Sequence, residues 1–98
     1  MPVLLDLNNQ AFQTSWFALG EEERAAVLQT CVKLAGMEWN DVYRDKGLHW
    51  EMIKSHSARD GTRLYTIRVS RKIRATVRRE GNFLEFLLLH PDHDSAYH

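Results

Sequence analysis

The chain has 98 residues, of which 44% are hydrophobic and 27% charged, and its formal net charge is zero. This is enough for one domain with a small core, and we expect a single domain over residues 1–98. The apolar runs are shorter than the roughly 18–20 residues of a membrane span, and no signal-peptide pattern precedes them. The one cysteine, Cys31, excludes an internal disulfide. We therefore expect a cytoplasmic protein that does not enter a membrane.

The first half of the chain has the patterns of helices. Residues 2–7 read as a short strand, and residues 8–19 place Phe12, Trp16 and Leu19 at helical spacing. Residues 20–36 are the clearest helix, with three glutamates in the first turn, where the helix dipole favours negative charge. Its predicted apolar face consists of Val27, Leu28, Cys31 and Leu34. Residues 37–47 are expected to be irregular or a short helical turn.

From Leu48 onward the period of the pattern changes to two, which is typical of strands. Residues 48–54, 63–70 and 72–79 alternate between apolar and polar side chains, and Gly81-Asn82 forms a turn. Residues 83–90 are more uniformly apolar, as in a central strand covered on both faces. Helices followed by a series of strands predict an α+β fold with a mainly antiparallel sheet.

Basic residues gather in one segment despite the balanced total. Residues 54–79 hold nine of the thirteen basic side chains and one acid, Asp60. If residues 63–79 fold as a hairpin about Ser70–Lys72, the side chains of Arg68 and Arg74 project from the same face. Two readings remain open, a surface that binds a polyanion and a solvated face that deters edge aggregation. The first reading rests on the expectation that this face has no acidic partner, and its further RNA-binding candidates are Lys54, Arg71, Lys72 and Arg78.

The last nine residues, "HPDHDSAYH", carry the densest group of titratable side chains. A metal site could use His90, His93 and His98 with Asp92 and Asp94, but their spacing matches no standard zinc motif, so we expect no metal site. A nucleophilic role for Cys31 is also disfavoured, because a thiol on an apolar helix face behaves as a small hydrophobic group. Acid–base chemistry fits better, since His93 and Tyr97 would share one face of a helical turn and Glu51 could supply a carboxylate. A frayed terminus with histidines placed by chance is the alternative.

The stretch "LYTIRVSRKIRATVRREGNFLEFLLLHPDHDSAY", preceded by "KGLHWEMI" and two N-terminal helices, resembles the RelE/ParE superfamily of toxins from type II toxin–antitoxin pairs. The shared order is an aromatic-x-Ile-Arg strand, a short turn, x-Arg-Ala, a turn with glycine, an apolar strand and His-Asp-x-x-Tyr. The terminal histidine and tyrosine make the chain more similar to the mRNA endoribonuclease branch than to the gyrase-poisoning branch.

The resemblance implies a RelE-like fold, in which N-terminal helices pack on one face of a small, twisted, mainly antiparallel sheet. It also assigns roles to individual residues. It implies that Arg74 supports the scissile phosphate, with Arg68 as a basic position on the preceding strand. It also implies that Tyr97 stacks on a base or helps to activate the ribose hydroxyl, and that His93 is the general acid. Thr66 stands where some members have a second lysine.

From these residues and this resemblance, we expect a ribosome-dependent endoribonuclease that cleaves mRNA without a metal or another cofactor. Its expected partners are the ribosome, mRNA and a cognate antitoxin protein. The alternative is a toxin-like protein that only binds, either as a gyrase-directed inhibitor or as a scaffold for an antitoxin.

Overall fold

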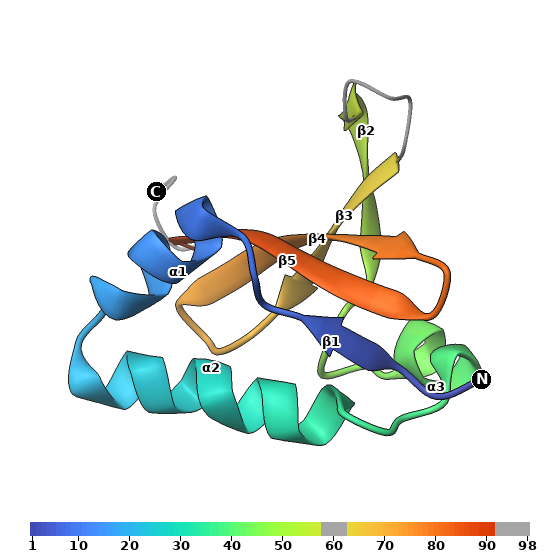
Figure 1. Cartoon of the computed structure of the whole chain (residues 1–98), viewed down its shortest axis with the longest axis horizontal. Helices are drawn as coiled ribbons and strands as arrows, with labels where there is room; N and C mark the ends of the chain where they lie inside the picture. Colours follow the sequence, from blue (N-terminus) through green and yellow to red (C-terminus); the bar gives the residue numbers. More distant parts are fainter. Residues whose placement is uncertain (58–62, 92–98) are drawn as a thin grey trace.

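The computed structural model describes the backbone of residues 1–57 and 63–91, and the side chains of residues 1–53 and 63–91. In these ranges the chain has an α+β fold, in agreement with the prediction (Figure 1). The elements in chain order are β1 (Leu4–Asp6), α1 (Gln10–Phe17), α2 (Glu21–Leu34), α3 (Trp39–Arg44), β2 (Glu51–Ser57), β3 (Arg63–Arg68), β4 (Ile73–Glu80) and β5 (Phe83–Pro91). None of the helices in the described part of the chain has the length and apolar character needed to cross a membrane.

One five-stranded sheet forms the centre of the fold, in the order β1-β5-β4-β3-β2. The sheet is mixed, because β1 runs parallel to β5 while the other neighbours are antiparallel. The helices lie on one side of the sheet, and β2 and β3 rise away from them (Figure 1). The β3–β4 hairpin turns at Ser70–Lys72, as the sequence predicts, and pairs Arg68 with Arg74.

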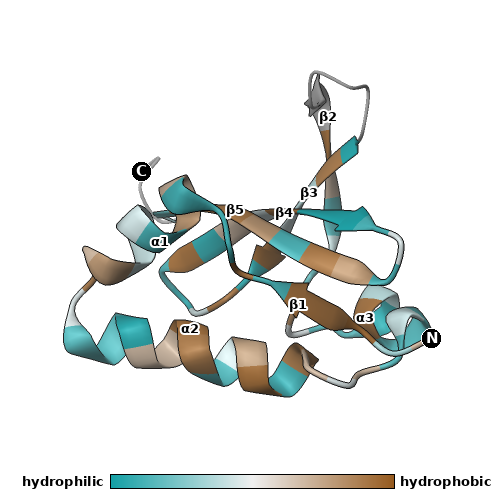
Figure 2. Cartoon of the chain, viewed as in Figure 1, coloured by the Kyte–Doolittle hydropathy of each residue, from teal (hydrophilic) through white to brown (hydrophobic). Residues whose placement is uncertain are grey.

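The core lies between the helices and the sheet. Phe12 of α1 is fully buried, and its ring centroid lies 5.2 Å from that of Phe86 on β5. Along the ribbon, β1 is mainly hydrophobic, and hydrophobic and hydrophilic residues alternate along α2 (Figure 2). Residues 37–47, predicted to be irregular or a helical turn, contain the six-residue helix α3, whose Trp39 and Val42 are buried.

The apolar face of α2 differs from the prediction at one position. Val27, Cys31 and Leu34 are buried as expected, but Leu28 is 50% exposed. Thr30 is buried in its place, and its hydroxyl donates a hydrogen bond of 3.1 Å to the carbonyl of Val69. The face of α2 that meets the sheet is therefore rotated away from Leu28, and a polar side chain is accommodated there because its hydroxyl has a partner.

β5 lies inside the sheet, between β1 and β4, but the prediction that both of its faces are covered is wrong. Leu84, Phe86 and Leu89 are buried under the helices, while Phe83 and Leu88, on the other face, are 47% and 43% exposed. β1 pairs only with residues 83–85, and beyond it the edge of β5 is capped by α1, where the backbone N–H of Leu89 donates to Ser15 Oγ at 3.2 Å.

Candidate phosphate-binding face

The face of the sheet opposite the helices collects the polar side chains of three neighbouring strands. In the strand register, Arg68 of β3 stands opposite Arg74 of β4, and Arg74 stands opposite His90 of β5. Thr66 and Thr76 form the next cross-strand pair. Directly paired residues of antiparallel strands project to the same side. The two arginines and the histidine therefore form one row across the sheet, which we call the arginine row (Arg68, Arg74 and His90).

Arg74 is held at the centre of the arginine row by two acceptors. Its Nη2 atom donates to Thr66 Oγ1 at 2.8 Å and to the backbone carbonyl of His49 at 3.2 Å. Only 9% of the residue is exposed. Arg74 was predicted to project outward, and it does lie on the predicted face, but its neighbours enclose it. A guanidinium held in this way can meet a phosphate only at a defined position.

His49 reaches Arg74 through an unusual backbone conformation. Its φ of 49° is the only positive value outside glycine in the described residues. Histidine is among the residues enriched in this left-handed region. The turn directs the His49 carbonyl to Arg74, and the imidazole lies 3.9 Å from the carboxylate of Glu51. Glu51 itself pairs with Thr66 in the register, so this predicted carboxylate lies on the same face as the arginine row.

His90 is the member of the arginine row that the sequence did not single out for acid–base chemistry. Its Nε2 atom lies 3.1 Å from Thr76 Oγ1, at hydrogen-bonding distance. In the sequence it reads as the first residue of the histidine-rich tail, and there it was considered only as a metal ligand. The signal that could have found it is its position in a strand, since extending β5 by period two places residue 90 opposite residue 74.

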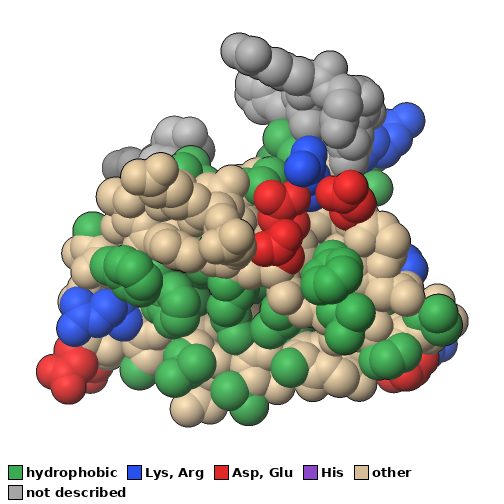
Figure 3. Space-filling model, viewed as in Figure 1, with side chains coloured by type: hydrophobic (Ala, Val, Ile, Leu, Met, Phe, Trp, Pro, Cys, Tyr) green, Lys and Arg blue, Asp and Glu red, His purple; other side chains and the backbone are tan. Residues whose placement is uncertain are grey.

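The predicted absence of acidic partners on this face is wrong. Arg78 Nε donates to Glu85 Oε1 at 2.6 Å across the β4–β5 pair, and Arg78 Nη2 lies 3.9 Å from Glu80 Oε2. Acidic and basic side chains lie close together below the β2–β3 hairpin (Figure 3). On this face Arg78 forms its ion pair near the β4–β5 turn, and the arginine row lies nearer the β3–β4 turn. Arg78 is less suited to RNA binding than the sequence predicts.

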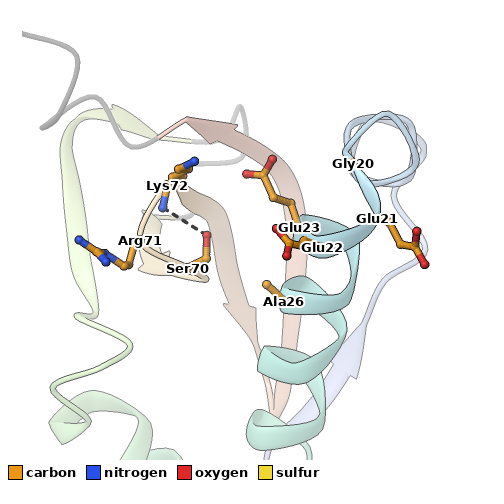
Figure 4. A pocket seen from close by; sticks show the side chains of 8 residues that line it. All are labelled: Gly20, Glu21, Glu22, Glu23, Ala26, Ser70, Arg71 and Lys72. Atoms are coloured by element: carbon orange, nitrogen blue, oxygen red, sulfur yellow. Dashed lines mark hydrogen bonds between the residues drawn. The ribbon is translucent and has the colours of Figure 1, made fainter.

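Arg71 and Lys72 lie at the rim of the face, in the β3–β4 turn, as predicted. A groove of about 530 Å³ separates this turn from the N-terminus of α2. Lys72 and Glu23 lie over the groove, while Arg71 points away from α2 (Figure 4). Because three glutamates of α2 line the same groove, the positive field of the turn is partly offset on this side. Arg71 remains directed away from them.

The side chains of three predicted site residues lie outside what the structure describes. His93 and Tyr97 lie outside the described residues, and so does the side chain of Lys54. Within the described part of the chain, no three histidine, cysteine, aspartate or glutamate side chains gather closely enough to hold a metal ion. Burial raises the pKa of the Cys31 thiol to about 11, which leaves it protonated and unreactive near neutral pH.

The arrangement suits the binding of a phosphodiester. Two guanidiniums from adjacent strands can share the charge of one phosphate, because each presents a planar fork of N–H donors. An imidazole in the same row can transfer a proton near neutral pH.

Comparison with protein-family models, curated proteins and solved structures finds no significant match to this chain.

Proposed function

We propose that the chain is an endoribonuclease of the RelE/ParE toxin type that cleaves mRNA on the ribosome. The observation that carries the proposal is the arginine row, in which Arg68 and Arg74 stand side by side with His90 across three strands. The order of motifs in the second half of the chain adds the resemblance described above. The proposal includes a RelE-like fold, a cytoplasmic location and a cognate antitoxin that neutralises the protein.

The proposed reaction uses the 2′-hydroxyl of the ribose as the nucleophile. It needs a base for that hydroxyl, stabilisation of the pentavalent phosphorane and an acid for the leaving 5′-oxygen. Arg74, held by Thr66 and by the His49 carbonyl, would stabilise the phosphorane without reorganising during the reaction. Arg68 would share the phosphate charge. No metal is needed in this scheme, because the guanidiniums supply the positive charge.

Proton transfer is assigned to histidine and tyrosine side chains. The resemblance gives this role to His93 and Tyr97. His90 is a second candidate, because it stands opposite Arg74 and its Nε2 atom is at hydrogen-bonding distance from Thr76. Glu51, on the same face, would supply a carboxylate beside the site.

The proposal is tested by adding the purified protein to a reconstituted translation reaction and mapping mRNA cuts by primer extension. We expect Arg68→Ala and Arg74→Lys to lower the cleavage rate by about 10²–10³-fold, the usual cost of losing one transition-state donor. Arg74→Lys keeps the charge but loses the fork. Arg44→Ala is the control, because Arg44 is an exposed arginine on α3 whose partners among the described residues are Asp41 and the carbonyl of Asn40. Inhibition without any mRNA cut would contradict a nuclease.

A second candidate is a scaffold that binds an antitoxin without cleaving RNA. The enclosure of Arg74 favours it, since both of the hydrogen bonds described for this guanidinium go to the protein itself. In that case Arg74→Lys would lower the free energy of unfolding, and the wild-type protein would cut no mRNA in the same assay.

A further inference from the structure

A second concave site lies on the other side of the sheet from the arginine row. It is a recess of about 370 Å³ lined by Tyr43, Arg63, Tyr65, Arg79 and Gly81. Tyr65 pairs with Val77, which is fully buried under the helices, so these side chains are on the helix-covered face. We call this site the tyrosine–arginine recess. It draws its residues from α3, β3, β4 and the β4–β5 turn.

The aromatic walls of the recess are fixed by neighbouring rings. Tyr65 stacks on Trp50 with centroids 4.6 Å apart, and Tyr43 meets the edge of Trp50 at 5.2 Å. Trp39 contacts Tyr43 from the other side at 5.8 Å. Tyr43 is nevertheless 43% exposed. The recess thus presents tyrosine rings whose positions are set before any ligand arrives, which lowers the entropy cost of binding.

The two arginines of the recess differ in how they are held. The guanidinium of Arg79 lies 4.2 Å from the centre of the Trp39 ring, and it donates to the Tyr43 hydroxyl and to the Gly81 carbonyl, both at 2.7 Å. These bonds use Nη1 and Nε, and no hydrogen bond of the Nη2 donors is found among the described residues. Arg63 is exposed, and its described hydrogen bond goes to the sulfur of Met52, a weak acceptor. No acidic side chain is among the described residues that line the recess.

We propose that the tyrosine–arginine recess binds one unpaired nucleobase of single-stranded RNA together with an adjacent phosphate. The base would stack on the tyrosine rings, and Arg63 and the Nη2 donors of Arg79 would contact the phosphate. Stacking platforms beside basic side chains are how proteins bind single strands without reading their sequence. A volume of about 370 Å³ is at the lower end for ligand pockets, which suits one nucleotide.

The chemistry favours RNA over an acidic peptide. An acidic segment would be drawn to the two arginines, but it has no planar group to cover the tyrosine rings. A nucleotide uses both parts of the site, because its base and its phosphate are linked at short range. The choice of RNA rests on the proposed function, whereas the contacts of the recess are independent of the arginine row.

The test is fluorescence anisotropy with a ten-nucleotide, single-stranded RNA of mixed sequence carrying fluorescein at its 5′ end. We expect Arg63→Gln to weaken binding several-fold and to reduce the salt slope of log K by about 0.7, the value for one phosphate contact on a single strand. Arg44→Gln changes the net charge equally and lies outside the recess, so it should leave both quantities unchanged. Tyr43→Ala should weaken binding about tenfold through lost stacking. Thermal unfolding of each variant checks that the fold is retained.

Arg68→Ala separates this inference from the proposed function. If Arg63→Gln binds like the wild type while Arg68→Ala does not, the recess is not an RNA site and the arginine row keeps its proposed role. If only Arg63→Gln and Tyr43→Ala weaken binding, the recess proposal is supported and the arginine row is not. If the wild-type protein binds a labelled Asp/Glu-rich peptide but does not bind the RNA, the recess proposal is overturned.

Discussion

The replacement Thr66→Val tests whether Arg74 depends on the threonine beside it. Valine keeps the shape and the strand propensity of threonine but removes the hydroxyl that accepts from Arg74 Nη2 at 2.8 Å. Arg74 as a whole is only 9% exposed, so water replaces the lost acceptor poorly. The His49 carbonyl, at 3.2 Å, then remains as the acceptor for Nη2.

The expected size of the effect follows from the charge of the donor. A hydrogen bond to a charged group contributes about 1.5–3 kcal/mol, against about 0.5–1.5 kcal/mol for a neutral one. We expect Thr66→Val to lower the free energy of unfolding by about 1.5 kcal/mol, which is about 6–12 °C in Tm for a domain of this size. The released guanidinium would also shift, so cleavage should fall although no reacting group is removed.

Urea denaturation, followed by tryptophan fluorescence, measures the stability change, and primer extension measures cleavage. Thr76→Val is the matched control, because the same substitution on the paired strand removes a contact of 3.1 Å to His90 in place of the contact to Arg74. It should cost less stability than Thr66→Val. Equal stability of Thr66→Val and the wild type, with unchanged cleavage, would refute the view that Thr66 positions Arg74.

Three further predictions concern other parts of the molecule. Glu85→Gln removes the charge that pairs with Arg78 at 2.6 Å, and it should strengthen RNA binding to the sheet face, measured by anisotropy. Weaker binding would contradict the view that the ion pair with Glu85 makes Arg78 less suited to RNA binding. The Cys31 thiol, with a pKa of about 11, should not react with a disulfide reagent at pH 8 until urea unfolds the chain, and rapid reaction of the folded protein would be inconsistent with its burial. The backbone N–H of Leu48 holds the pKa of the Asp45 carboxyl below its ordinary value. The stability that the Asp45 carboxylate contributes should therefore be fully present above about pH 4, and it should be lost as the pH falls through the folded-state pKa of Asp45. Asp45→Asn should flatten this part of a curve of unfolding free energy against pH.

The strands and the β3–β4 hairpin could be predicted because alternation of period two sets which side chains share a face. Cross-strand pairing of Arg68 with Arg74 followed from the position of the turn alone. The covering of β5 could not be predicted in the same way. Its apolar run fits burial on both faces, but the helices cover one side of the sheet, and Leu88 stays exposed on the other.

The charge of the candidate site was misjudged because charges were counted along the sequence. Residues 54–79 contain one acid, but the β4–β5 hairpin brings Glu85 back beside Arg78. A count of the charges within residues 54–79 does not include an acidic partner, such as Glu85, that lies in the next strand. The tyrosine–arginine recess was missed for a similar reason, since Tyr43, Arg63 and Arg79 are far apart in the sequence and meet only in the fold.

The position of β5 between β1 and β4 has a consequence for how the chain folds during synthesis. Leu4 of β1 pairs with Phe83 of β5, so β1 leaves the ribosome well before β5 and cannot form its strand pairing until β5 has emerged. Contacts of such long sequence separation slow folding, because the loop entropy is lost before the contacts form. Until β5 emerges, Phe12 lacks its partner Phe86 and the arginine row lacks His90. The nascent chain therefore stays without its core and without a complete candidate site, which leaves an interval in which another protein can bind it before it folds.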